Sequence, residues 1–311
     1  MKKITQPLLL FLKGIGMGAA DVVPGVSGGT VALVTGIYER LLAAINSIDN
    51  QAIKLLSKYE IKRLWKHIDG PFLLVLVGGI ATSVITLAKV VTYLLEVYPI
   101  QLWSFFFGLI VISAILVLRN IKSWAADKVI LLLIGVAIAY LITEATPATT
   151  PEGLWFIFLS GAIAICAMIL PGISGSFILL IMGKYEFIVN AVNDRDIPII
   201  LTFMVGCIVG LLSFARVISW LFKRYHDLAI ALLSGFMIGS LNKVWPWKLP
   251  VQFRLNSEGE QVIYITKNVL PAEYARELSQ NPNLFQGLLF MALGIFIIVA
   301  IEKIAARLRS A

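Results

Sequence analysis

Charged side chains are scarce in this sequence of 311 residues, of which Asp, Glu, Lys and Arg make up only 14%. Ordinary soluble domains carry about 25%. Hydrophobic residues make up 59% of the chain, so a cytosolic enzyme and a disordered chain are both excluded. The composition instead predicts an all-α protein that crosses a membrane several times.

Cysteine and histidine are also rare, with two of each. Cys166 and Cys207 lie within apolar runs, where a thiol behaves as a small hydrophobic group, and so low a count excludes a disulfide-rich scaffold. His67 and His226 stand far apart without a cluster of carboxylates or cysteines. The sequence also lacks a Ser/His/Asp arrangement and a paired-carboxylate spacing, so we expect no metal ion, no cofactor and no catalytic site.

Long apolar runs predict the membrane spans. Two apolar stretches, 7–45 and 153–192, are too long for one helix and contain Pro-Gly-X-Ser-Gly near their middle. Proline removes a backbone donor and glycine loosens the chain, so each stretch predicts a broken helical hairpin, either re-entrant or fully spanning. The breaks are expected at Pro24, Gly25, Pro171 and Gly172. Six other runs can cross roughly 30 Å of hydrocarbon as single helices, at residues 71–95, 100–119, 127–143, 197–222, 227–245 and 284–302.

The net charge of +8 reflects an uneven distribution of Lys and Arg. Most of them fall in loops on the side of the N-terminus, whereas the opposite side has few although it contains the longest polar loop. The positive-inside rule therefore predicts cytoplasmic termini, and no nucleic-acid partner is needed to explain the charge. The basic segment 47–70 is expected either to lie on anionic membrane lipids or to be a solvated connector. The outer loop, 246–283, is expected to hold a small β-hairpin and a short helix that begins at Pro271.

The two Pro-Gly motifs belong to a longer internal repeat. Residues 24–39 and 171–186 are identical at eight of sixteen aligned positions without a gap. Further along the chain, Gly79 pairs with Gly206 at a slightly shorter offset, because the basic loop lengthens the first copy. The chain therefore contains two related halves.

Each half consists of one hairpin followed by three transmembrane helices, over residues 1–143 and 153–311 of one integral membrane domain. A hairpin returns the chain to its starting side and three is an odd number, so the second half must enter the membrane from the opposite side. Inverted repeats with broken helices are typical of secondary transporters that work by alternating access.

Both motifs place hydroxyl and glycine residues directly after the helix break. A helix start offers unpaired amide groups, which favour an anion and phosphate in particular. The simpler alternative is a tight turn whose serine only caps its own helix. The candidate phosphate-binding residues are Ser27, Gly28, Gly29, Thr30, Ser174, Gly175 and Ser176.

Lys89 and Arg216 are repeat-equivalent cations inside apolar spans. An ionisable side chain there costs about 2.5–3.5 kcal/mol and so needs a partner. We expect these two side chains to clamp the phosphate; the alternatives are snorkelling and an ion pair with Asp21, Glu39 or Glu186.

Two matching Tyr-Glu pairs end the repeated motifs, Tyr38 with Glu39 and Tyr185 with Glu186. These residues are candidates for carrying a coupling proton or sodium ion, or for gating. Asp21 is a further candidate, although its position in the second half is not acidic.

The segment that begins at Gly14, GIGMGAADVVPGVSGGTVALVTGIYERL, and its second copy, LPGISGSFILLIMGKYE, closely resemble the bacterial polyprenyl-phosphate transporter family. The resemblance covers nearly the whole chain. It implies a protein of the bacterial inner membrane that returns undecaprenyl phosphate, or a related polyprenyl phosphate, from the outer to the cytoplasmic leaflet. This step recycles the lipid carrier for peptidoglycan and other envelope polymers.

The residues alone leave other functions open. A secondary transporter of a small anion would use the same helix starts, and a membrane enzyme acting on lipid phosphate would need a nucleophile or metal cluster that is not visible in the sequence. A scaffold without transport would leave the matched cations unexplained.

Overall fold

The computed structural model describes residues 2–23, 25–255 and 261–310. This part of the chain is helical apart from one two-stranded sheet. Five of its helices are long and apolar enough to cross a membrane, which confirms the prediction of an all-α membrane protein. They are α6 (Gly70–Val97), α7 (Pro99–Leu118), α8 (Ala126–Glu144), α12 (Ile197–Arg224) and α15 (Leu284–Ser310).

Both hairpins break after their first helix, as the Pro-Gly motifs predict. The first hairpin consists of α1 (Lys2–Val22), α2 (Gly28–Val34) and α3 (Tyr38–Asn46), and the second of α9 (Leu154–Ile169), α10 (Gly175–Ile181) and α11 (Tyr185–Asn193). Gly25 and Gly172 turn the chain with φ of +86° and +89°, a region that glycine enters without a steric penalty. Pro171 is buried beside Gly172, while Pro24 lies outside the described residues.

A second bend divides each hairpin again, and the sequence analysis missed it. The chain turns by 113° between α2 and α3 and by 106° between α10 and α11. Gly36 and Gly183, with φ of +70° and +62°, lie at these bends. At 1.5 Å per residue the seven residues of α2 or α10 span only about 10 Å, so neither short helix crosses a bilayer by itself.

The first helix of each hairpin packs on a long helix of its own half. Helix α1 lies along α6, and α9 lies along α12. Gly14 on α1 faces Gly79 on α6 so closely that a Cβ on Gly79 would collide with the carbonyl group of Phe11. A Cβ on Gly206 would collide in the same way with the carbonyl group of Phe158 on α9. Small residues allow such close backbone contact between membrane helices.

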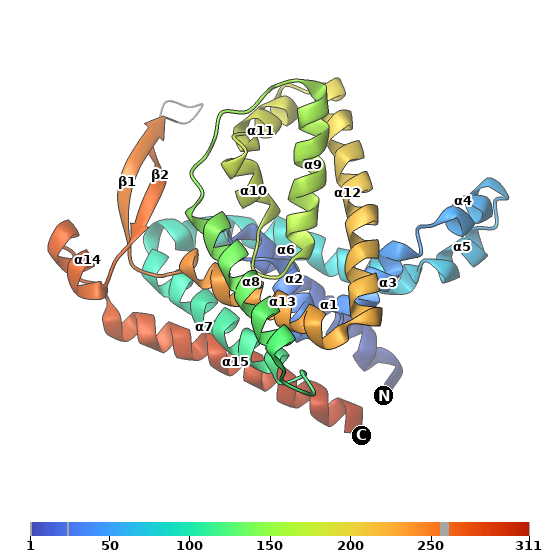
Figure 1. Cartoon of the computed structure of the whole chain (residues 1–311), viewed down its shortest axis with the longest axis horizontal. Helices are drawn as coiled ribbons and strands as arrows, with labels where there is room; N and C mark the ends of the chain where they lie inside the picture. The colour runs from blue at the N-terminus through green and yellow to red at the C-terminus, as the bar shows by residue number, and fades with distance from the viewer. Residues whose placement is uncertain (1, 24, 256–260, 311) are drawn as a thin grey trace.

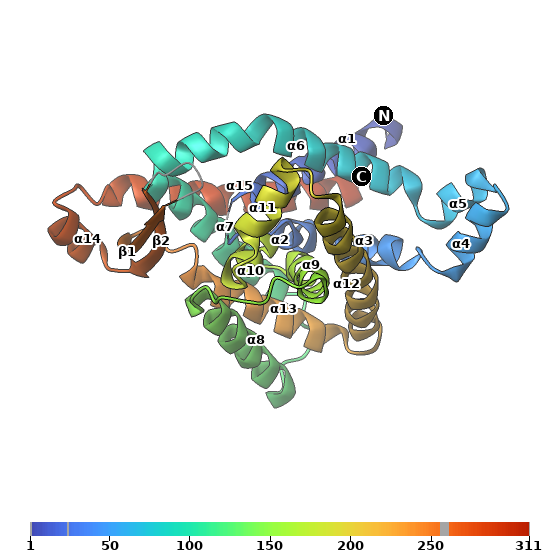
Figure 2. The same ribbon diagram turned by 90° about the horizontal axis from the view of Figure 1, so that it is seen from above.

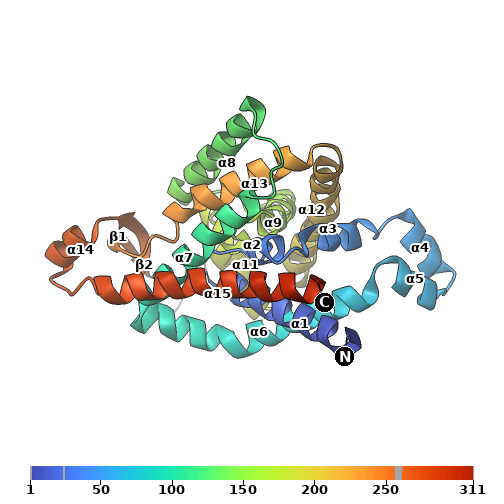
Figure 3. The same ribbon diagram turned by 90° about the horizontal axis from the view of Figure 1, so that it is seen from below.

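The remaining long helices pair across the two halves. Helix α7 packs along α15, and α8 packs along α13 (His226–Gly239), as Figure 3 shows. Gly108 on α7 meets the backbone of Met291 on α15, and Gly135 on α8 meets Gly235 on α13. Of the three helices that follow each hairpin, the second in one half therefore contacts the third in the other: α7 contacts α15, and α13 contacts α8.

Helix α13 is shorter than the expected span 227–245. It ends at Gly239 and continues as a 3₁₀ turn, η1 (Ser240–Asn242). Fourteen residues cover only about 21 Å, so α13 is too short to cross the hydrocarbon alone. The expected span was wrong beyond Gly239 because the apolar residues after it, such as the buried Val244, pack inside the protein.

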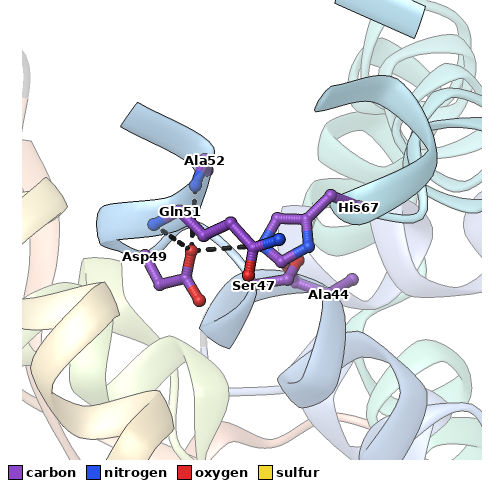
Figure 4. A network of polar contacts seen from close by, with 6 residues as sticks. All are labelled: Ala44, Ser47, Asp49, Gln51, Ala52 and His67. Atoms are coloured by element: carbon purple, nitrogen blue, oxygen red, sulfur yellow. Dashed lines mark hydrogen bonds and ion pairs between the residues drawn. The ribbon is translucent and has the colours of Figure 1, made fainter. Parts of the chain in front are cut away.

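The basic segment forms two short helices, α4 (Asn50–Ser57) and α5 (Ile61–His67). Asp49 caps α4 by accepting hydrogen bonds from the amides of Gln51 and Ala52, both at 2.9 Å, and lies 3.1 Å from His67 on α5 (Figure 4). The side chains of these two helices are mostly exposed, and the exposed ones include apolar side chains on both helices. The two helices project away from the other helices (Figure 2).

The loop 246–283 contains the predicted hairpin and helix. Strands β1 (Lys248–Leu255) and β2 (Gln261–Asn268) pair antiparallel, with Lys248 opposite Asn268, and α14 (Pro271–Leu278) follows. Trp247 anchors this unit, because its indole donates to the carbonyl of Pro282 at 2.8 Å. The hairpin and α14 lie at one end of the molecule, and α4, α5 and both termini lie toward the other (Figure 1).

Candidate functional site

The two hairpins meet at their breaks, although the motifs lie about 140 positions apart in the sequence. The hydroxyl of Ser27 is 3.1 Å from the carbonyl oxygens of Met168 and Leu170, to which it donates. In return, the amide of Gly172 donates to the hydroxyl oxygen of Thr30 at 2.9 Å. Ser27 and Thr30 have no solvent-exposed surface. The two breaks are thus joined by buried polar contacts, which are strong where water is excluded.

Within the first motif, the amides of the helix start already have partners inside the protein. Asp21 accepts from the amide of Gly28 at 2.7 Å, and Ser27 accepts from the amide of Gly29 at 3.0 Å. Ser27 is therefore the N-cap of α2, and Asp21 places a carboxylate where the helix dipole favours negative charge. An anion could reach these amides only if Asp21 or Ser27 moved away.

The second motif is different. Its two hydroxyls, on Ser174 and Ser176, bond to each other at 2.7 Å, and neither caps the helix start. No group in the described part of the chain accepts a hydrogen bond from the amides of Gly175 and Ser176. Ser174 is buried and Ser176 is half-buried. Two amides, and the one hydroxyl proton that the two serines do not use between them, therefore remain available for an anion here.

Lys89 and Arg216 lie on exposed faces of α6 and α12. Neither forms a hydrogen bond or ion pair with a residue that the structure describes, so the expected alternative of a partner among Asp21, Glu39 and Glu186 is not observed in this conformation. Both cations are exposed, whereas the residues at the hairpin breaks are mostly buried.

The two Tyr-Glu pairs occupy different environments. Tyr38 is buried, with its ring 5.7 Å from that of Phe222, and its hydroxyl has no partner among the described residues. Glu39 is exposed and lies 3.5 Å from His226 at the start of α13. Tyr185 is exposed and Glu186 is half-buried. The repeat therefore does not place these residues in matching surroundings.

Two lysines that the sequence analysis did not single out contact the hairpins. Lys184 is 2% exposed, donates to the carbonyl of Thr150 at 3.1 Å and lies 5.0 Å from the ring centroid of Phe187. Lys243 touches the first break, because its Cγ lies 2.6 Å from the position of a Cβ on Gly25. Lys243 lies within the expected span 227–245, so the sequence did not mark it as a site residue. Its contact with Gly25, more than 200 positions earlier, leaves no pattern in the neighbouring sequence.

Among the described residues, no three His, Cys, Asp or Glu side chains lie together in a way that could hold a metal ion.

The sequence profile of a family described as undecaprenyl phosphate translocase-like matches residues 17–262. A polyprenyl-phosphate transporter of Vibrio cholerae serotype O1 is 45% identical over 305 residues, which cover 98% of this chain and 99% of that protein. A polyprenyl-phosphate transporter of Staphylococcus aureus is 32% identical over 254 residues, which cover 76% of this chain and 85% of that protein. No solved structure matches the chain.

Proposed function

This chain belongs to the undecaprenyl phosphate translocase-like family, and we propose that it moves undecaprenyl phosphate, or a related polyprenyl phosphate, from the outer to the cytoplasmic leaflet of the bacterial inner membrane. The family is one of transporters rather than enzymes. One structural observation carries the proposed mechanism. Two broken hairpins join at their breaks through the buried hydroxyls of Ser27 and Thr30, so a polar centre lies inside an apolar protein.

We propose that residues 1–143 and 153–311 are inverted repeats that exchange access to this centre. The equivalent contacts of α1 with α6 and of α9 with α12 support a common plan for the two halves. The bent short helices α2 and α10 support re-entrant hairpins, which would return to their own side of the membrane. Rocking of one hairpin against the other would expose the centre to each leaflet in turn.

The phosphate would bind first at the second motif. Its hydroxyls on Ser174 and Ser176 and its amides on Gly175 and Ser176 have the fewest competing partners. Residues Ser27 to Thr30 would join when Asp21 releases the start of α2. Lys89 and Arg216 would neutralise the phosphate after a movement of α6 and α12, since both side chains are exposed in this conformation.

Coupling would involve a proton or a sodium ion at acidic groups near the hairpins. Asp21 is the best placed of them, because its carboxylate holds the start of α2 and any neutralisation would weaken that hold. Glu39 and Glu186, with Tyr38 and Tyr185, would serve at the bends that follow the short helices.

The distribution of charges and the arrangement of the helices support an orientation with cytoplasmic termini. Both termini and the basic helices α4 and α5 lie away from the β-hairpin and α14 (Figure 1). Cytoplasmic termini would place the hairpin and α14 on the outer side and the basic helices against the anionic inner leaflet.

The site is tested by titrating purified protein in detergent with a short-chain polyprenyl phosphate. Ser174→Ala and Arg216→Ala should each weaken binding about tenfold or more, because a hydrogen bond to a charged group is worth about 1.5–3 kcal/mol. Thr82→Val is the control, since Thr82 is exposed and bonds only within α6. Unchanged affinity in both site variants would rule out this phosphate site.

A further inference from the structure

A cavity of about 520 Å³ lies beside the second hairpin, where the end of α8, helix α10, η1 and the β-hairpin come together. Three lysines line it: Lys243, Lys248 and Lys267. Glu144 is the one acidic residue among its described lining residues. The lining therefore has two more basic than acidic residues, and the two strands supply part of it.

Two of these amines lie over aromatic rings, and one of the two also donates to a backbone carbonyl. The Lys243 amine lies 4.0 Å from the ring centroid of Phe177, and the Lys248 amine lies 3.9 Å from that of Trp103. Lys248 also donates to the carbonyl of Lys243 at 2.6 Å. Both side chains are half-buried, whereas Lys267 is exposed at the rim and lies 4.0 Å from Glu273.

Such a pair of cations is costly without an anion. Burial lowers the pKa of Lys243 to about 8, with Glu144 partly offsetting the effect, so this amine stays protonated at neutral pH. Burial, and then the charge of Lys243, hold the pKa of Lys248 well below its usual value. Glu144 is exposed and accepts a hydrogen bond from Asn242 at 2.6 Å, so it compensates the two amines only in part. An anion between the amines would remove their repulsion and favour their charged forms.

The second hairpin lines the cavity, and one of the cavity's lysines contacts the first hairpin. The stem of Lys243 packs on the turn at Gly25, and its amine faces Phe177, which directly follows Ser176 of the second motif. Apolar side chains such as Leu180 and Val251 line the same space. A phosphate carried on an apolar chain would therefore find cations for its headgroup and an apolar wall for the first part of its tail.

We propose that this cavity is the outer receiving site for a phosphate monoester headgroup, with Lys243 and Lys248 as its ligands. The proposal rests on the proposed lipid transport and gives the β-hairpin a role, since β1 supplies Lys248 and β2 completes the wall. From here the headgroup would pass the turn at Gly25 to reach the joined hairpin breaks.

The test compares Lys243→Gln and Lys248→Gln with Lys62→Gln, which removes the same charge from the exposed surface of α5. Purified protein is titrated with a short-chain polyprenyl phosphate and, separately, with inorganic phosphate. Each cavity variant should weaken lipid binding about tenfold or more, whereas Lys62→Gln should leave it unchanged. Lys243→Arg keeps the charge and should bind within a few-fold of the wild type, which separates loss of the charge from loss of the fold.

Three results would overturn parts of this scheme in distinguishable ways. If the wild type binds the lipid and both glutamine variants bind it equally well, the cavity proposal fails while the transport proposal stands. If inorganic phosphate binds as tightly as the lipid and depends on the same lysines, the cavity is a free-phosphate site instead. If the wild type neither binds nor moves the lipid, the proposed function itself fails.

Discussion

Gly78 and Gly79 are neighbours on α6 for which the structure predicts opposite effects of the same substitution. A Cβ on Gly78 would have only the edge of the Phe11 ring nearby, at 3.9 Å. A Cβ on Gly79 would collide with the carbonyl oxygen of Phe11 and approach the Cα of Gly14 to 3.0 Å. These are backbone atoms of α1, so they can move away only if the whole helix shifts.

The magnitudes follow from two competing terms. Replacing glycine by alanine inside a helix gains about 0.8–1.0 kcal/mol. Gly78→Ala should therefore leave the protein slightly more stable. In Gly79→Ala the same gain is outweighed by overpacking, which costs typically about 1–3 kcal/mol and more when only backbone can yield. Gly206→Ala should repeat the loss, because Phe158 on α9 stands where Phe11 stands on α1.

Reversible unfolding of the purified protein in mixed micelles, with increasing denaturing detergent, measures these differences. The expected order of the free energy of unfolding is Gly78→Ala at or above the wild type, and Gly79→Ala and Gly206→Ala below it. If Gly79→Ala matched Gly78→Ala within about 0.5 kcal/mol, the close contact of α1 with α6 would be refuted.

Two further predictions concern the hairpin breaks and the basic segment. Thr30→Val removes the acceptor of the buried amide of Gly172, so the free energy of unfolding should fall by about 1–3 kcal/mol in the same assay. Thr82→Val, at an exposed position, should change it little. Equal losses in the two variants would contradict the contact between the hairpins. The pKa of Asp49 lies below its ordinary value of 3.8, chiefly through the amide of Ala52. The contribution of Asp49 to folding is therefore present above pH 3.8 and lost as the pH falls through the lower folded value. Asp49→Ala should speed hydrogen exchange of the Ala52 amide at neutral pH without lowering global stability, and unchanged exchange would count against the cap.

Local chemistry made much of this fold predictable. The Pro-Gly breaks, the long apolar helices and the β-hairpin each depend on residues close together in the sequence, such as Gly25 with its positive φ. The bends at Gly36 and Gly183 were missed because each lies inside a long apolar stretch that was interpreted as only two helical limbs. The early end of α13 was missed for the same reason, since hydrophobicity alone does not separate lipid-facing residues from buried ones.

The candidate site shows where sequence reasoning stops. The repeat identified both motifs but gave no sign that Thr30 would bond to the amide of Gly172. It also suggested equivalent roles for two serines that differ in the structure, since Ser27 caps its helix and Ser174 pairs with Ser176. Such differences depend on contacts between distant segments, which the sequence of one half does not contain.

Translocation by the purified protein tests the proposed transport most directly. Labelled undecaprenyl phosphate would be placed in one leaflet of proteoliposomes, and its arrival in the other leaflet followed with and without an imposed proton or sodium gradient. We expect movement well above that in protein-free liposomes, dependence on one of the gradients, and loss of movement in Arg216→Ala. Lipid that stays in its leaflet although the protein is folded, while a small soluble phosphate crosses, would contradict lipid transport and favour a small-anion carrier.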